Sequence, residues 1–160
     1  MAGLASAPIQ GLTNTPPRIL VVEDDPDIRR LNTEVLTDSG YHVEAVEDGV
    51  AAWQALNTDG YDLLITDNNM PRVTGLELIK KMRSEDMTLP IILMSGMLPT
   101  EELVRHPWLQ IQATLLKPYT IAELLVTVEK VLCTPLFGPR AQIAPPANWQ
   151  RLPAGARLQY

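Results

Sequence analysis

The sequence of 160 residues has little cysteine or histidine, few aromatic residues and no long apolar run. Its one cysteine, Cys133, excludes an internal disulfide and fits a reducing compartment; it ends a helical pattern, where we expect it to pack. No apolar run approaches the length of a membrane span. A signal peptide would begin with basic residues, but no basic residue precedes Arg18. We therefore expect a cytoplasmic protein without a membrane-inserted segment.

Features that would indicate several other classes of protein are also missing. The chain has neither a Walker-type loop nor a G-x-G-x-x-G motif, so it lacks the usual signatures of nucleotide binding. Its formal net charge of −6 argues against direct binding to nucleic acid. His42 and His106 lack the setting of a phosphodonor or a metal ligand, and we expect both in solvent. With 46% hydrophobic and 20% charged residues, the composition is that of a globular domain.

Charge divides the chain into three segments. Residues 1–17 carry no charged side chain, and we expect a flexible leader. Residues 18–133 hold all 19 acidic residues and 10 of the 13 basic ones, and are expected to form one domain. Residues 134–160 hold no acid, three arginines and five prolines, and are expected to be an extended basic tail. The aromatic residues of this tail leave an alternative, in which it lies back on the acidic domain or on a partner.

Four short apolar runs have the length and composition of strands buried on both faces. They are Ile19–Val22, Leu63–Thr66, Ile91–Met94 and Ala113–Leu116. Residues Tyr41–Ala45 alternate between apolar and polar side chains, which is typical of a half-exposed edge strand. The pattern thus predicts five strands.

Helix signals lie between these strands and after the last one. Start signals are Asp25 before Pro26, Asp48, Thr74 with Glu77, and Thr120 with Glu123; Ser39-Gly40 is a stop signal. The fourth helix begins near Thr100, but His106-Pro107 should break it, so we expect a short or irregular element. Strands that alternate with helices predict right-handed βαβ units around a parallel sheet, which is an α/β fold.

Each of the four apolar runs is followed by residues that could act chemically. Glu23 and Asp24 follow the first, Asp67 the second, Ser95 the third and Lys117 the fourth. The carboxyl ends of parallel strands share one edge of the sheet, where open α/β sheets bind ligands. Carboxylates brought close together repel each other, so they need a cation, and magnesium suits oxygen ligands of this kind. Each residue alone could be a helix cap, a turn residue or a surface lysine; the coincidence of all five favours a site.

The pattern resembles the receiver domain of response regulators in two-component signalling. The residues that carry the resemblance are Val22-Glu23-Asp24-Asp25-Pro26, Asp67-Asn68-Asn69-Met70-Pro71 with Gly75, Ser95-Gly96, and Lys117-Pro118. They span residues 18 to about 133. The resemblance implies a flavodoxin-like three-layer fold with strand order 2-1-3-4-5.

The resemblance also implies a role for each site residue. Asp67 would be the phosphoacceptor, and the family places Mg²⁺ on Asp24, on the backbone carbonyl of Asn69 and, mainly through water, on Glu23. Lys117 would contact the phosphoryl group, after a cis bond to Pro118, and Ser95 would move to bond it. The implied partners are a sensor histidine kinase or a histidine phosphotransfer protein as donor, and an unknown protein that receives the output. Self-phosphorylation and autodephosphorylation would be the only enzymatic steps.

One position departs from the family's pattern. The third residue before Lys117 is Thr114, where many members have an aromatic residue that rotates inward as the hydroxyl moves. Thr114 cannot act as that large side chain. The resemblance therefore carries the phosphorylation chemistry to this chain but not the usual readout.

Three alternatives remain beside a stand-alone phosphorylation switch. The first is a receiver-like scaffold that binds partners without phosphorylation, which would be favoured by loss of Asp67, Lys117 or the acid pair. The second is a receiver that forms part of a hybrid histidine kinase. The third is a magnesium-dependent phosphohydrolase, which would need a general acid where this chain has Asn69. The tail is too short and too rich in proline for a DNA-binding or catalytic output domain.

Overall fold

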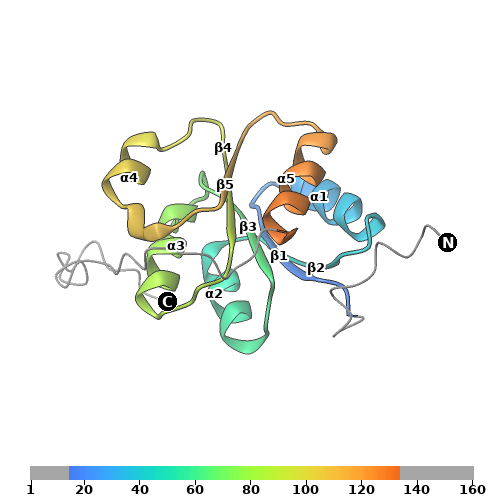
Figure 1. Ribbon diagram of the computed structural model, residues 1–160, viewed down its shortest axis with the longest axis horizontal. Coiled ribbons are helices and arrows are strands. Elements are labelled where there is room, and N and C mark those ends of the chain that lie inside the picture. Colours follow the sequence, from blue (N-terminus) through green and yellow to red (C-terminus); the bar gives the residue numbers. More distant parts are fainter. Residues whose placement is uncertain (1–14, 134–160) are drawn as a thin grey trace.

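Five parallel strands form the central sheet of the protein in this computed structural model, which describes residues 15–133. The strands are β1 (Arg18–Val22), β2 (His42–Val46), β3 (Leu63–Asp67), β4 (Ile91–Ser95) and β5 (Ala113–Leu116). Their order across the sheet is β2-β1-β3-β4-β5 (Figure 1). The predicted strands and the predicted order are therefore confirmed.

The burial of the strands follows from their position in the sheet. Every residue of β3 and β4 is buried, as are the last four of β1, since these strands have a neighbour on each side and helices on both faces. The edge strands β2 and β5 are only partly buried. This is why the inner strands appear in the sequence as continuous apolar runs and β2 as an alternating one.

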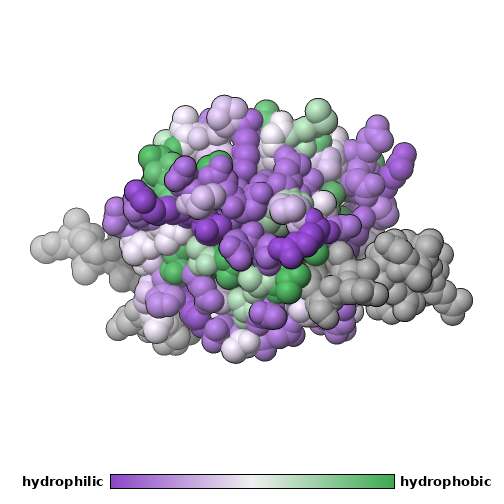
Figure 2. Space-filling view, turned by 180° about the vertical axis from the view of Figure 1, so that it is seen from behind, coloured by the Kyte–Doolittle hydropathy of each residue, from purple (hydrophilic) through white to green (hydrophobic). Residues whose placement is uncertain are grey.

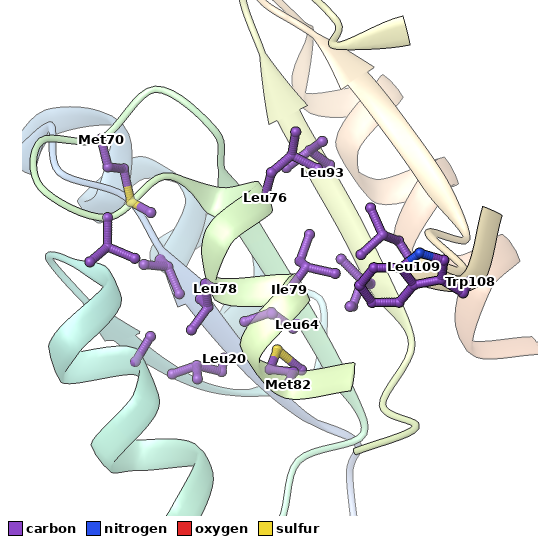
Figure 3. Close-up of a cluster of buried hydrophobic side chains, with 14 residues drawn as sticks. Leu20, Leu64, Met70, Leu76, Leu78, Ile79, Met82, Leu93, Trp108 and Leu109 are labelled. Atoms are coloured by element: carbon purple, nitrogen blue, oxygen red, sulfur yellow. The ribbon is translucent and has the colours of Figure 1, made fainter. Parts of the chain in front are cut away.

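Helices cover both faces of the sheet and give three layers. They are α1 (Pro26–Asp38), α2 (Gly49–Thr58), α3 (Gly75–Ser84), α4 (Thr100–Arg105), the 3₁₀ helix η2 (Pro107–Leu109) and α5 (Ile121–Cys133). Figure 1 shows α2, α3 and α4 on one side of the sheet and α1 and α5 on the other. Each face has its own apolar core. The larger core is drawn in Figure 3, where Leu78, Ile79 and Met82 of α3 lie against Leu20 and Leu64 of the sheet.

The predicted capping residues begin the helices as expected. The carboxylate of Asp25 accepts hydrogen bonds from the backbone at the start of α1, and that of Asp48 does so for α2. Thr74 and Glu77 form a reciprocal capping box on α3. After α1 the chain turns at Gly40, whose φ of 98° is a left-handed conformation that glycine adopts without strain.

The helix between β4 and β5 is short and ends where His106-Pro107 predicted a break. The helix α4 has six residues, none of them buried, whereas Trp108 and Leu109 of η2 are buried in the core. His106 is partly exposed, and it lies 3.4 Å from Glu102 and edge-on to Trp108, so the expectation that it lies in solvent holds in part. Cys133, which we expected to pack, is exposed on the last turn of α5.

Most of the two terminal segments lies outside the described residues. The expected leader 1–17 is described only from Thr15 on, and the expected tail 134–160 is not described, so both remain predictions.

Hydrophilic side chains cover most of the face in Figure 2, and apolar ones gather mainly across its lower middle. Within residues 15–133, every helix is too short or too polar to cross a membrane.

Candidate functional site

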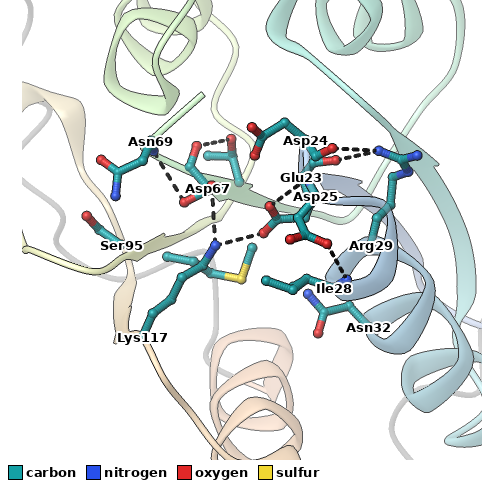
Figure 4. Close-up of polar contacts among 12 residues, drawn as sticks. Glu23, Asp24, Asp25, Ile28, Arg29, Asn32, Asp67, Asn69, Ser95 and Lys117 are labelled. Atoms are coloured by element: carbon teal, nitrogen blue, oxygen red, sulfur yellow. Dashed lines mark hydrogen bonds and ion pairs between the residues drawn. The ribbon is translucent and has the colours of Figure 1, made fainter. Parts of the chain in front are cut away.

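The residues that follow the strands meet at the carboxyl edge of the sheet, as the sequence predicted. Backbone hydrogen bonds continue the strand pairing past the strand ends, so they fix the positions of the site residues relative to one another along the strands. The N–H of Lys117 donates to the carbonyl of Ser95 at 2.9 Å, and that of Glu23 donates to Val46 at 3.1 Å. Figure 4 shows Glu23, Asp67 and Lys117 around one point of this edge.

Three carboxylates form the acidic part of the site. One oxygen each of Glu23, Asp24 and Asp67 lies within 4.8 Å of the others. Glu23 and Asp67 are buried, and Asp24 is exposed. Burial of this kind disfavours a negative charge, and it raises the pKa of Glu23, an effect that the hydrogen bond from Lys117 partly opposes. The site therefore favours any cation that can compensate these carboxylates.

The ammonium group of Lys117 provides part of that compensation. Its Nζ lies 2.9 Å from Oε2 of Glu23 and 3.3 Å from Oδ2 of Asp67, so it bridges the two buried acids. Burial lowers the pKa of Lys117, but the hydrogen bond and charge of Glu23 and the charge of Asp67 outweigh it, and the pKa is raised. Lys117 is thus held as a cation beside the side chain of Asp67.

The loop after β3 is folded tightly around Asp67. The N–H of Asn69 lies 3.3 Å from Oδ1 of Asp67, and the side-chain oxygen of Asn68 accepts from the N–H of Leu76. Gly75 begins α3 directly against this loop, and a Cβ atom there would lie only 2.4 Å from the carbonyl oxygen of Asp67. The close approach of α3 therefore requires glycine at this position.

Ser95, which is expected to move on phosphorylation, ends β4, and Thr114 lies on β5. The hydroxyl of Ser95 donates to the carbonyl of Met97 at 2.6 Å and accepts from its N–H at 3.2 Å, so in the described part of the chain it bonds Met97 and not Asp67. Thr114 is an exposed residue of the edge strand β5, paired in register with Leu93. Ser95 would have to leave Met97 to reach a group on Asp67.

The sequence pattern did not predict two polar features near the site. The guanidinium of Arg29 reaches back from α1 to the loop that carries Glu23 and Asp24 (Figure 4). The buried Asn32 and the partly buried Tyr119 form hydrogen bonds with each other between α1 and the loop after Lys117. A signal for Arg29 was present, since it stands one helical turn after the cap Asp25, but the Asn32–Tyr119 pair gave none.

Comparison with known proteins gives a consistent result. The family model of the response regulator receiver domain matches residues 19–129. The response regulator receiver protein CpdR of Brucella abortus is 32% identical over 120 residues, which cover 72% of this chain and 96% of CpdR. The transcriptional regulatory protein CusR of Escherichia coli K12 is 31% identical over 115 residues, 72% of this chain and 51% of CusR. The chain thus spans about half the length of that relative.

A solved structure with a similar fold is that of the response regulator TrrA of Thermotoga maritima, in complex with Mg²⁺ and BeF. Its TM-score is 0.64 at 32% identity, and the match covers 72% of this chain and 98% of TrrA. The fold of this chain is therefore similar to that of a solved response regulator.

Proposed function

The chain belongs to the response regulator receiver domain family, and on that premise we propose that it is a phosphorylation switch whose phosphoacceptor is Asp67. The observation that carries the proposal is the bridge from Lys117 to Asp67 and Glu23 at the carboxyl edge of the sheet. The donor would be a sensor histidine kinase or a histidine phosphotransfer protein, and the output a protein contact.

The acidic cluster suits a magnesium ion. Its donors are carboxylate oxygens close enough to share one cation, and Mg²⁺ prefers such oxygens together with water and phosphate. We propose that Asp24, Asp67 and the backbone carbonyl of Asn69 hold the ion, with Glu23 acting mainly through water. TrrA, a response regulator of similar fold, was solved in complex with Mg²⁺ and BeF, which supports a magnesium site in this chain but does not identify its ligands. When bound, the ion would neutralise charge on the phosphoryl oxygens.

The chain's own residues supply the rest of the chemistry. A carboxylate oxygen of Asp67 forms a bond to phosphorus while the bond from phosphorus to the donor breaks, and the leaving group keeps that electron pair. With acetyl phosphate the leaving group is acetate; with phosphohistidine the departing ring nitrogen keeps the electron pair, and the ring takes up one proton from solvent to become neutral imidazole. The phosphorylated side chain of Asp67 carries a charge of about −1.5 to −2. Lys117 stays protonated beside it and balances part of that charge.

Phosphorylation of Asp67 would then change the hydrogen bond that the hydroxyl of Ser95 donates. The new phosphoryl oxygens are strong acceptors, and the hydroxyl of Ser95 has one proton, which it now gives to Met97. Transfer of that hydrogen bond would release the loop that leads into α4. Thr114 is small and exposed, so we propose that the change passes along this loop rather than through a side chain at position 114.

The first test is the mass of the intact protein after incubation with acetyl phosphate and Mg²⁺. We expect one added phosphoryl group in the wild type, none in Asp67→Asn and none without Mg²⁺. Asp59→Asn is the matched control, because Asp59 is an exposed carboxylate at the end of α2, and it should be modified like the wild type.

The outcomes separate the alternatives. Modification that persists in Asp67→Asn would show that another residue is the acceptor and would refute the assignment. No modification at any time, with no structural response to beryllofluoride, would favour a scaffold that works without phosphorylation. Steady turnover of phosphate monoesters would instead indicate a phosphohydrolase.

A further inference from the structure

Arg29 contacts the loop that carries the two acids of the proposed cation site. Its Nη1 donates to the carbonyl oxygen of Glu23 at 2.8 Å and lies 3.4 Å from that of Asp24. Both partners are backbone groups, and among the described residues Arg29 makes no ion pair with a carboxylate. Its charge is thus directed at peptide carbonyls of residues 23 and 24, not at their side chains.

The position of Arg29 on α1 explains this contact. The helix begins at Pro26 after the cap Asp25, and the N–H of Arg29 closes the first turn on the carbonyl of Asp25. Long side chains on a helix point back toward its N-terminus, which here is the loop after β1. Arg29 is half-buried, so its guanidinium is partly shielded from water, and a hydrogen bond from a charged donor is stronger than one between neutral groups.

The loop is therefore held from two sides. On the sheet side, the N–H of Glu23 donates to Val46, and on the helix side Arg29 holds the carbonyls of Glu23 and Asp24. The N–H of Asp25 also donates to Oε1 of Glu23. When the peptide groups of residues 23 and 24 are fixed, the directions in which their side chains project from the backbone are fixed as well.

We propose that Arg29 is a positioning residue for the cation: it holds the Glu23–Asp24 loop so that both carboxylates face Asp67 before Mg²⁺ arrives. This inference rests on the proposed function, which places the ion there. The sign of the effect distinguishes it from simple electrostatics. Removing a positive charge near a cation site should tighten Mg²⁺ binding by Coulomb's law, whereas removing a positioning group should weaken it.

The test is the affinity for Mg²⁺ measured by calorimetric titration, without any phosphodonor. Arg29→Met should raise the Kd by about tenfold or more, the loss typical of groups that orient metal ligands. Arg29→Lys, which can still donate to one carbonyl, should recover part of that loss. Arg30→Met is the matched control, because Arg30 is the next residue on α1, is largely exposed and, within residues 15–133, pairs with Glu34 alone. It removes the same charge and should leave the Kd unchanged or slightly lower.

A second readout separates cation binding from phosphoryl transfer. The rate of modification by acetyl phosphate in Arg29→Met should return to near the wild-type rate as Mg²⁺ is raised to saturation, because the defect lies in holding the ion. Urea denaturation without Mg²⁺ reports whether Arg29→Met is folded. If that variant is unfolded, the Kd of Arg29→Lys is compared with that of the wild type instead.

The inference and the proposed function can fail separately. Mg²⁺ binding by folded Arg29→Met as tight as in the wild type would overturn the role of Arg29 alone. A rate that stays low at saturating Mg²⁺ would also overturn it. Wild-type protein that binds Mg²⁺ but is never modified at Asp67 would refute the proposed function and leave the Kd comparison intact.

Discussion

The partly buried hydrogen bonds between Asn32 and Tyr119 allow a quantitative prediction. Asn32 lies on α1 and is 3% exposed, and its Nδ2 donates to the hydroxyl of Tyr119 at 2.9 Å. As a donor, the hydroxyl oxygen of Tyr119 lies 3.2 Å from Oδ1 of Asn32 and 3.1 Å from Sδ of Met94. Tyr119 follows Lys117 by two residues, so the pair ties the loop of the proposed catalytic lysine to α1.

The expected cost depends on whether one partner is removed or both. Tyr119→Phe leaves the buried amide of Asn32 without this partner, which should cost about 1–3 kcal/mol. Asn32→Leu leaves the hydroxyl with the sulfur of Met94 as a weak acceptor, and should cost a similar amount. The double variant leaves no orphaned polar group and should lie within about 1 kcal/mol of the wild type. The coupling energy is the sum of the two single losses minus the loss of the double variant, so it should be about 3–4 kcal/mol if each single substitution costs about 2 kcal/mol.

The measurement is a double-mutant cycle by urea denaturation of the full chain. With a slope of about 2 kcal/mol/M, a loss of about 2 kcal/mol lowers the midpoint by about 1 M, which is readily measured. Strictly additive effects of the two substitutions would refute the reasoning, because they would show that the amide and the phenol do not depend on each other. A double variant less stable than either single one would do the same.

Two other substitutions test close packing and a titrating group. Gly75→Ala should lower the midpoint of urea denaturation and slow modification by acetyl phosphate, because the new Cβ would lie 2.4 Å from the carbonyl of Asp67; Gly60→Ala, where a Cβ meets nothing within 4 Å, should do neither. Burial and the hydrogen bond to Glu44 raise the pKa of Tyr61 above its usual 10.0, so the folded protein favours the protonated phenol. The stability that this group contributes is present below roughly pH 10 and is lost as the pH rises above it, so the difference in Tm between wild type and Tyr61→Phe should shrink from about pH 8 to pH 11. A Tm difference that stays constant over this pH range would contradict a raised pKa of Tyr61 in the folded protein.

The elements of the fold were predictable because their signals are local. The cap of α1 needs only Asp25 and Pro26, and the end of that helix needs only Gly40. Inner strands such as β3 and β4 are buried on both faces and thus consist of unbroken apolar runs. The length of α4 followed from Pro107, which can neither donate a backbone hydrogen bond nor fit in the middle of a helix.

The site was predictable for a different reason. Parallel strands carry whatever follows them to the same edge, so residues as distant as Glu23 and Lys117 could be placed together without knowledge of side-chain conformations. The contacts of Arg29 and of the Asn32–Tyr119 pair depend on side-chain direction and on the distance between elements. Such contacts have no fixed spacing in the sequence, so the contacts of His106 and the exposure of Cys133 were not predicted either.

The segment between β4 and β5 is anchored unequally, and this bears on how a change at Ser95 would spread. Its C-terminal part is fixed by the burial of Trp108 and Leu109, and the buried Arg83 of α3 donates to the carbonyl of Leu109 at 2.8 Å. Its N-terminal part, α4, has no side-chain cap and no buried residue. The ion pair of Glu102 with Lys80 is partly exposed, and such pairs are worth about 0–1 kcal/mol. Because the loop after Ser95 leads directly into α4, a shift of that loop meets the least resistance there, while the anchored η2 keeps the core and β5 in place.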